Sequence, residues 1–531
     1  MTIGCDMNIA LRRTRLNDSP GAHLGWLYTG AFLAAILAGG VSSTSKLSLV
    51  GVFAALLAAL ALMFSRRALL LLIVIGGLVV TGLAQLYLPD LKYIKYVTPI
   101  IAFILFMHGA MDAVMRPPGL RETPQHQSSS GILVFAAVFM VIAVMSTLIN
   151  WDPGLAILGF KGYFTIWILL YAVVLTKWKG RELRIFTVVF LVLAFIQLPV
   201  TLHQYLYLVP LRRPYAGEIT PVDVVAGTFG ALLLGGGANA VFTLFMFIVV
   251  ACLIGIWKRG KLSTFWTAAL SVTFLLPVLF NETKIAAVYL PVVFLTLFYR
   301  DIVQRPLRFI VMGCVASGMF AVLITVLIML HPGDDVKSWS DLFRVTFENE
   351  TSGISEQSDS EYSKLTRWTV LTFWAQENIS EHPIHIALGW GPGASRIIEE
   401  GETRWTETLA EKRYGGGSTG IRIGYTAFSA LLWDVGVVGF LAVLAMFYAA
   451  YRTATRLEIA YRSRDPYLSG IFDGLRAATI MMVISLAHKD FFVVHLPFQT
   501  LMLLIFGFMI VAQRQLAGEE PSSSVPRIHG G

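Results

Sequence analysis

Apolar runs of about 20 residues recur along this chain, and they limit its possible folds more than any other feature. A run such as residues 131–149 is long enough to cross the hydrocarbon layer of a bilayer as an α-helix. Hydrophobic residues make up 56% of the 531 positions and charged residues only 14%. Because a water-soluble domain cannot carry so much apolar surface, the sequence predicts an all-α, polytopic membrane helix bundle.

We predict about 14 transmembrane helices from the apolar runs. They are expected near residues 24–41, 47–64, 68–88, 94–115, 131–149, 155–176, 184–209, 231–257, 263–281, 285–299, 308–330, 425–451, 471–487 and 491–513. Residues 1–23 are polar and basic and have no small-residue cleavage site, so they predict a cytoplasmic tail before a retained first helix. Residues 514–531 predict a disordered cytoplasmic tail.

The orientation follows from the basic residues. With the N-terminus inside, the loops predicted to face inward hold the larger share of Lys and Arg, loop after loop. This bias predicts that both termini are cytoplasmic. It also explains the net charge of +8 without nucleic acid, which we exclude as a partner.

Two segments predicted to face outward are long, and long loops in a tightly connected chain tend to carry function. They cover residues 210–230 and 331–424. The second is predicted to be partly helical from Leu365 up to Pro383, and the tryptophans of this stretch favour a helix along the membrane surface. The predicted organisation is transmembrane helices 1–11 over residues 24–330, the extracytoplasmic loop over 331–424, and helices 12–14 over 425–513.

The cysteines suggest neither a disulfide nor a metal site. Cys5 lies in the tail, whereas Cys252 and Cys314 lie inside apolar runs, so no pair falls in an outward loop. We therefore expect no metal and no cofactor.

Five basic residues are predicted on the outer side, against the orientation bias. They are Arg212, Arg213, Lys284, Arg367 and Arg396. An anionic substrate would explain them, because guanidinium groups bind phosphate oxygens in a bidentate way. Contact with lipid headgroups is the alternative.

Other outward or membrane-embedded residues are candidates for chemistry. Asp434 lies within the predicted twelfth helix, where a carboxylate is either functional or a hydrogen-bond partner of a neighbouring helix. His382 and His488 are candidate general bases, with purely structural roles as the alternative. Trp390, in the "GWGPG" stretch, is either a platform for a sugar ring or an anchor at the membrane interface.

Four segments occur in a characteristic order around the large outward loop. They read "VVAGTFGALLLGGGANAVFTL", "NETKIAAVYLP", "TRWTVLTFWAQENISEHPIHIALGWGPG" and "YTAFSALLWDVGVVGFLAVL". In this order and placement the chain resembles the O-antigen ligase and polysaccharide polymerase superfamily of bacterial envelope membrane proteins.

The resemblance implies a metal-independent glycosyltransferase in the bacterial inner membrane. It would transfer a glycan from a polyprenyl diphosphate to a sugar hydroxyl at the outer face, and so build an envelope, capsular or exopolysaccharide. By position, Lys284 matches the cation at a helix mouth, Arg212 or Arg213 the second diphosphate ligand, and Asp434 the acidic position.

One position departs from the family. Tyr425 stands where the family has its catalytic histidine, which favours a polymerase over a ligase and leaves His382, Asp434 and His488 as candidate bases, with Tyr425 as a substrate contact. The resemblance also implies a flippase and a chain-length regulator as partners, besides membrane lipid. A lipid-linked sugar flippase and a non-catalytic export component are the alternatives, although the sequence predicts neither the internal repeat nor the interrupted helix typical of transporters.

Overall fold

The computed structural model describes residues 65–115, 130–307, 369–395 and 423–519, with short gaps at 177, 179, 216–219, 234–235, 282 and 425, together with a few isolated positions between 310 and 325. Within these ranges the regular elements are helices, and one antiparallel bridge joins Ala231 to Gly237. Ten helices of the described chain are long and apolar enough to cross a bilayer. The prediction of an all-α membrane fold is confirmed at this level, and the chain is a multi-pass membrane protein.

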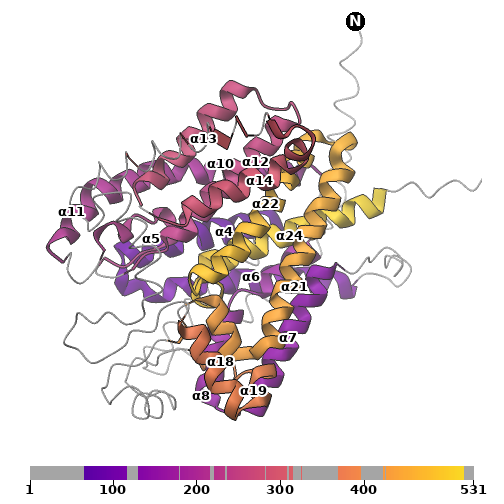
Figure 1. Cartoon of the computed structure of the whole chain (residues 1–531). Helices are drawn as coiled ribbons and strands as arrows, with labels where there is room; N and C mark the ends of the chain where they lie inside the picture. The colour runs from indigo at the N-terminus through magenta and orange to yellow at the C-terminus, as the bar shows by residue number, and fades with distance from the viewer. Residues whose placement is uncertain are drawn as a thin grey trace, which may run out of the picture.

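Three groups of helices follow one another along the chain (Figure 1). The first group comprises α4 (Arg66–Ile75), η1 (Gly76–Val80), α5 (Thr81–Tyr87), η2 (Pro89–Tyr96), α6 (Val97–Met115), α7 (Gly131–Ile149), α8 (Pro153–Phe164) and α9 (Ile168–Leu175). The second comprises α10 (Gly180–His203), η5 (Gln204–Leu208), α11 (Val209–Arg212), η6 (Arg213–Tyr215), η7 (Pro221–Val224), η8 (Gly227–Phe229), α12 (Asn239–Lys258), α13 (Thr264–Leu279) and α14 (Ala286–Gln304). The third comprises α18 (Thr369–Glu381), α19 (Pro383–Leu388), α21 (Ala427–Arg464), α22 (Pro466–His488), α23 (Phe491–Val494) and α24 (Leu496–Glu519).

The predicted spans can be compared with these helices one by one. Ten of them correspond to the ten helices long enough to cross a membrane. The predicted span 263–281 corresponds to α13, which has 16 residues. The predicted spans 24–41, 47–64 and 308–330 lie wholly or largely outside the described residues, so the total of about 14 stays a prediction.

Polar residues directly before apolar runs start several of the helices. Ser65, Asp152 and Ser263 each accept a hydrogen bond from the backbone N–H three residues further on. Thr426 and Ser429 form a reciprocal capping box at the start of α21. These caps satisfy backbone donors that the first turn of a helix leaves unpaired.

One end of the bundle collects basic residues, and we call it the basic end. Arg66 at the start of α4 contacts Asp112 in the last turn of α6. Arg184 of α10 lies 2.7 Å from Asp465, which separates α21 from α22. These contacts join helix ends that the predicted topology assigns to the same side of the membrane.

The opposite end carries the longer connections, and we call it the loop end. Residues 150–152, 213–215, 220–233, 236–238, 280–281, 283–285, 382–395 and 489–495 lie here, because successive crossing helices alternate in direction. In Figure 1 the basic end lies toward the upper right and the loop end toward the lower left.

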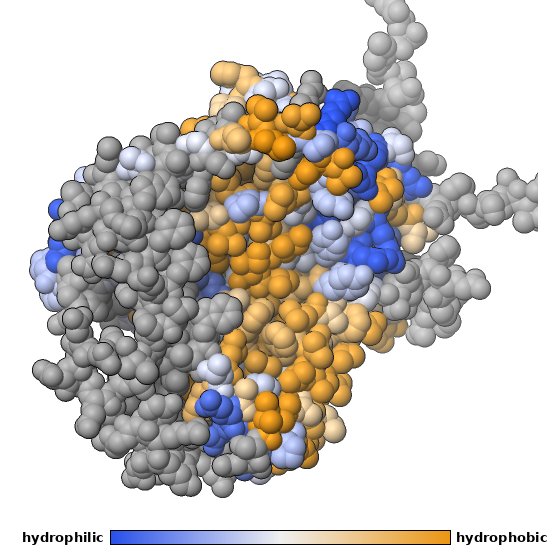
Figure 2. Space-filling model, in the orientation of Figure 1, coloured by the Kyte–Doolittle hydropathy of each residue, from blue (hydrophilic) through white to orange (hydrophobic). Residues whose placement is uncertain are grey.

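Two helices form the centre of the bundle and others face outward. The apolar windows of α12 and α24 are each 89% buried, whereas that of α14 is 17% buried. Apolar side chains cover the outward faces, for example Val141 of α7 and Phe265 of α13. Figure 2 shows this apolar surface as a broad orange area between blue patches, as expected for helices that face lipid.

Glycines allow the closest helix pair to approach. A Cβ at Gly255 of α12 would lie 2.0 Å from the carbonyl oxygen of Gly470, and a Cβ at Gly474 of α22 would lie 2.5 Å from the backbone of Cys252. Small residues at such contacts let membrane helices pack backbone to backbone. The position of α22 on α12 is therefore fixed by these three glycines.

Candidate functional site

The Gly-Thr-Phe segment at residues 227–229 is buried at the loop end, where two π-helical turns hold it. Thr228 Oγ1 donates to the carbonyl oxygen of Leu78, inside the π-helical turn η1, at 2.6 Å. Gln204, the first residue of the π-helical turn η5, accepts from the backbone N–H groups of Ala226 and Gly227 at 3.1 and 2.8 Å. π-Helical turns are rare and are frequent at functional sites.

Further contacts fix this segment from two other sides. Gln197 Oε1 accepts from the backbone N–H of Thr228 at 2.9 Å. A Cβ at Gly82 of α5 would lie 2.1 Å from the carbonyl oxygen of Thr228, so this approach requires glycine. His495, just before α24, places its Nε2 at 3.0 Å from the Phe229 carbonyl oxygen, to which it donates.

A row of polar side chains runs from this segment across the loop end. Asn239, the first residue of α12, donates from Nδ2 to Asp223 Oδ1 at 3.0 Å. Asn281 is buried after α13 and donates from Nδ2 to the Asn239 carbonyl oxygen at 3.2 Å and to Thr243 Oγ1 at 2.9 Å. We call Asp223, Asn239 and Asn281 the polar row.

The polar row connects the predicted cations of this end. Arg212 at the end of α11 is only 1% exposed. The negative charge of the Asp223 carboxylate lies close enough to favour the charged form of its guanidinium group. Arg213 follows it and is exposed. Lys284 is exposed in the turn before α14, and Asn281 orients this turn by accepting from the Thr283 N–H at 3.1 Å. Of the predicted diphosphate ligands, these three share one region, near the N-termini of α12 and α14.

Asp434 belongs to a second region of the loop end, where it binds the glycine-rich stretch. Its Oδ1 accepts from the backbone N–H of Ser395 at 2.7 Å. Its Oδ2 accepts from Tyr163 Oη at 2.8 Å and from Ser395 Oγ at 3.0 Å. The carboxylate is fully buried, and both oxygens are occupied by neutral donors. This geometry matches the structural alternative for Asp434 rather than a base poised to take a proton.

Helix α21 is interrupted beside Asp434, which the sequence did not predict. Gly436 has φ +66° and ψ −171°, which are not helical angles, and it joins two helical parts of α21 across a kink. The backbone N–H groups of Trp390 and Gly391 enter the break and donate to the carbonyl oxygens of Trp433 and Asp434 at 2.8 and 3.0 Å. Non-helical backbone at membrane depth requires such internal partners.

Trp390 packs against histidine rather than presenting a bare face. The His385 ring stacks on it with 3.4 Å between centroids and a 6° angle between planes. The His382 ring meets it edge-on at 5.0 Å. Trp390 Nε1 donates to Asn378 Oδ1 at 2.9 Å, so this indole anchors the loop to α18.

The helix predicted to lie on the membrane surface is instead docked in the protein. Trp374 of α18 is 8% exposed, and its Nε1 donates to the Leu432 carbonyl oxygen at 3.1 Å. It packs in a small apolar cluster with Phe373, Ile423 and Trp433. The prediction of a surface helix is wrong for the described part of this segment, because Trp374 fills the space beside the interrupted helix.

His488 lies in a third place, at the end of α22. The next residue, Lys489, accepts from the backbone N–H of Ala427 at 3.1 Å through its carbonyl oxygen. His488 is half-buried and lies beside the start of α21. The predicted site residues Arg367, Arg396 and Tyr425 lie outside the described residues.

Several residues that build these regions were missed from the sequence. Gln197 and Gln204 had a signal, since they are polar and stand seven apart on one face of an apolar run. Tyr163 and Ser395 had none, because their roles depend on contacts between distant segments. Asn150 had none either, because its Oδ1 accepts from His385 Nε2, at 2.9 Å, only in the folded chain.

Comparison of this sequence with known families and curated proteins identifies no relative. No model of a known protein family matches this chain, and a search of curated proteins finds no similar sequence.

Proposed function

We propose that the chain transfers a glycan from a polyprenyl diphosphate to a sugar hydroxyl at the loop end, which would face the extracytoplasmic side of a bacterial inner membrane. The observation that carries this proposal is the polar row, which links the region of Arg212 and Arg213 to that of Lys284. The same region holds the N-termini of α12 and α14, and helix N-termini favour phosphate groups. The polyprenyl chain would stay among lipids beside the apolar outer faces.

In the proposed reaction, the acceptor hydroxyl oxygen attacks the anomeric carbon that is bonded to the diphosphate. The bond between this carbon and the phosphate oxygen breaks, and polyprenyl diphosphate leaves with the electron pair. A base takes the hydroxyl proton. Cations beside the diphosphate stabilise the charge that grows on the leaving group.

His488 is the base we favour among the three predicted candidates. Asp434 has both carboxylate oxygens occupied, and His382 is packed against Trp390. His488 lies beside the start of α21, next to the segment in which the resembling family carries its histidine. Imidazole titrates near neutrality and is suited to this step.

Polymerisation is the form of the reaction that we favour over ligation. The reason is the resemblance together with Tyr425, which stands at the family's histidine position. In this form the acceptor is itself a lipid-linked glycan, and a flippase and a chain-length regulator would be the partner proteins. The product would be an envelope, capsular or exopolysaccharide.

The test is a reconstituted transfer assay with Arg213→Ala and Lys284→Ala. Purified protein is given a polyprenyl-diphosphate oligosaccharide, and longer lipid-linked products are separated by gel or mass. Loss of one charge-assisted hydrogen bond to phosphate weakens binding by about 1.5–3 kcal/mol, so each variant should lose about ten- to hundredfold activity. His488→Ala should abolish transfer while leaving substrate binding.

The matched control is Arg452→Ala, which removes an exposed arginine of α21 that contacts Tyr448. This variant should transfer at the normal rate. Full activity in both Arg213→Ala and Lys284→Ala would refute the diphosphate site. Transfer only to an acceptor without a lipid carrier would identify a ligase instead of a polymerase.

A transporter is the second candidate, because α21 is interrupted at Gly436 and interrupted helices are typical of transporters. In proteoliposomes, movement of a labelled lipid-linked glycan between leaflets without any longer product would favour this candidate. The break is filled by the 389–391 backbone, which favours the enzyme.

A further inference from the structure

A cluster of charged residues lies at the basic end, far from the polar row, with Glu458 and Asp473 buried and Arg462 and Asp301 exposed. It joins α12, α14, α21 and α22. Arg259 and Arg462 both contact Glu458, and Arg476 lies 2.7 Å from Asp473. Lys258 lies 3.4 Å from Asp301 and 4.0 Å from Asp473. We call these seven residues the charge cluster.

The charge cluster carries more positive than negative charge. It has four cations, Lys258, Arg259, Arg462 and Arg476, and three carboxylates, which leaves one positive charge in excess. The Nε atoms of Arg259 and Arg476 and the Oε2 atom of Glu458 are buried and make no hydrogen bond within the described chain, so two orphaned donors stand against one orphaned acceptor. Buried donors and an unbalanced charge are costly, so an anion at this place would be stabilised.

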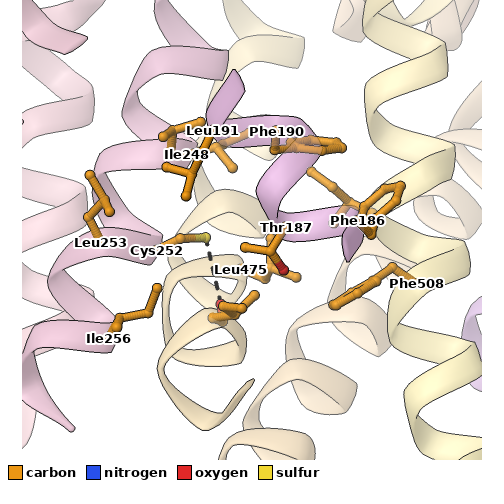
Figure 3. A pocket seen from close by; sticks show the side chains of 13 residues that line it. Phe186, Thr187, Phe190, Leu191, Ile248, Cys252, Leu253, Ile256, Leu475 and Phe508 are labelled. Atoms are coloured by element: carbon orange, nitrogen blue, oxygen red, sulfur yellow. Dashed lines mark hydrogen bonds between the residues drawn. The ribbon is translucent and has the colours of Figure 1, made fainter. Parts of the chain in front are cut away.

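An apolar cavity of about 40 Å³ lies next to this cluster, between α10, α12, α22 and α24 (Figure 3). Its wall includes Phe186, Phe190, Ile256 and Phe508. Cys252 also lines it and donates from Sγ to the Ile471 carbonyl oxygen at 3.8 Å. An apolar cavity of this kind does not hold ordered water, because water needs polar partners.

The cavity and the charges are connected along the helices. Cys252, Ile256 and Arg259 follow one another at spacings of four and three residues, so they lie on one face of α12. On α10, Arg184 precedes the cavity-lining Thr187 by one turn. Thr187 is half-exposed, so the α10 wall of the cavity borders the lipid.

We propose that the cavity and the charge cluster together bind one anionic phospholipid of the leaflet at the basic end. The end of an acyl chain would enter between α10 and α12, and the headgroup phosphate would lie beside Arg259 and Arg462. Basic pockets between membrane helices are suited to such headgroups. The apolar lining next to an excess cation identifies an amphipathic anion rather than a free one. This inference does not depend on glycosyl transfer at the loop end.

Native mass spectrometry of the full chain tests this proposal. The protein in mild detergent is titrated with phosphatidylglycerol, with phosphatidylcholine and with inorganic phosphate. One phosphatidylglycerol should be retained in preference to phosphatidylcholine. Arg462→Ala should weaken its binding about fivefold, since one basic residue contributes about 1 kcal/mol to such attraction. This arginine is 46% exposed, and Glu458 keeps its contact with Arg259, so the variant should fold.

Two further variants separate a built site from general surface charge. Thr187→Phe fills the cavity from its lipid side and should also weaken phosphatidylglycerol binding. Arg452→Ala removes an exposed arginine of the same helix outside the cluster and should leave binding unchanged. Equal loss in Arg452→Ala and Arg462→Ala, or equal retention of both lipids, would overturn the proposal.

Cys252 provides a second measurement in a chain with Cys5→Ser and Cys314→Ser. Phosphatidylglycerol should slow alkylation of Cys252 by N-ethylmaleimide several-fold, because the acyl chain covers the thiol. Inorganic phosphate should have no effect on this rate. If phosphate displaces the lipid and gives the same protection, the site binds a free anion and the lipid assignment is wrong.

Discussion

The two ends of this bundle are joined by different interactions. At the basic end, charged side chains meet one another, as in the contacts of Glu458 with Arg259 and Arg462. At the loop end, neutral donors and backbone groups meet, as in the contacts of Asp434 with Tyr163 and Ser395. The same helices run between both ends, so the two ends differ in the side chains that join the helices there.

The difference indicates where a ligand is expected. At the basic end several cations contact carboxylates of the chain itself, and some of these pairs join neighbouring helices. At the loop end Arg213 and Lys284 are exposed, and the packing there depends on amides and glycines instead. Exposed cations such as Arg213 and Lys284 can be reached by a substrate from outside the bundle.

The first test of this comparison uses two glycines with nearly equal, positive φ angles. Gly436 has φ +66° at the loop-end break, and a Cβ there would lie 2.4 Å from the backbone of Ala387. Gly260 has φ +68° at the basic end, with nothing within 4 Å of its Cβ. Gly436→Ala should therefore abolish folding, whereas Gly260→Ala should cost only about 1–2 kcal/mol of backbone strain.

The measurement is the yield of monodisperse protein in detergent and its thermal midpoint. The Gly260→Ala protein should elute as a single species with a midpoint a few degrees lower. A well-folded Gly436→Ala protein would mean that the 389–391 backbone does not occupy the break in α21.

The second prediction compares a buried carboxylate from each end. Glu458 is buried, and Glu458→Gln leaves the half-buried Arg259 with only Asp473, at 4.0 Å, as a charge partner; breaking a buried pair costs about 3–5 kcal/mol. In Asp434→Asn one side-chain oxygen still accepts a hydrogen bond, and no charge partner is lost. A donor that faced the other oxygen loses its acceptor, which should cost about 1–3 kcal/mol. Thermal midpoints of the two variants in the same detergent measure the difference.

Activity provides the control for this pair. If Asp434 only holds the glycine-rich stretch, the loss of transfer in Asp434→Asn should be matched by Ser395→Ala, which removes one donor to the same carboxylate. A large loss of transfer in Asp434→Asn with normal stability would make this residue the base instead. Equal destabilisation by the two amide substitutions would contradict the difference between the ends.

How much of this could be predicted from the sequence depends on the kind of signal. Apolar runs predicted the described membrane helices, because hydrocarbon thickness fixes the length of a span. The position of Arg212, Arg213 and Lys284 at one common end of the bundle could also be predicted, since it follows from counting spans. Their grouping by the polar row could not be predicted, because Asp223 and Asn281 are linked through Asn239 only in the folded chain.

The interrupted helix shows the limit most clearly. Gly436 stands in an apolar run that continues on both sides, so its glycine looks like an ordinary packing residue. The break is stabilised by N–H groups of Trp390 and Gly391, which lie more than 40 residues earlier in the chain. The hydrophobic pattern around Gly436 does not reveal a partner so far away in the sequence, and the helix was therefore predicted to be continuous.

The smallest expected effect concerns the pH dependence of the loop end. Burial, and then the charge of His382, lower the pKa of His385, whose Nδ1 is buried without a hydrogen bond. Below about pH 6.5 the unfolded chain takes up a proton here that the folded chain does not, so stability falls as pH drops. His385→Gln should reduce the fall in thermal midpoint between pH 7.5 and 5.5 by at most about 2 °C. If His385→Gln leaves the fall in thermal midpoint unchanged, protonation of His385 beside Trp390 does not destabilise the folded protein. The loop end would then tolerate a buried charge as the basic end does.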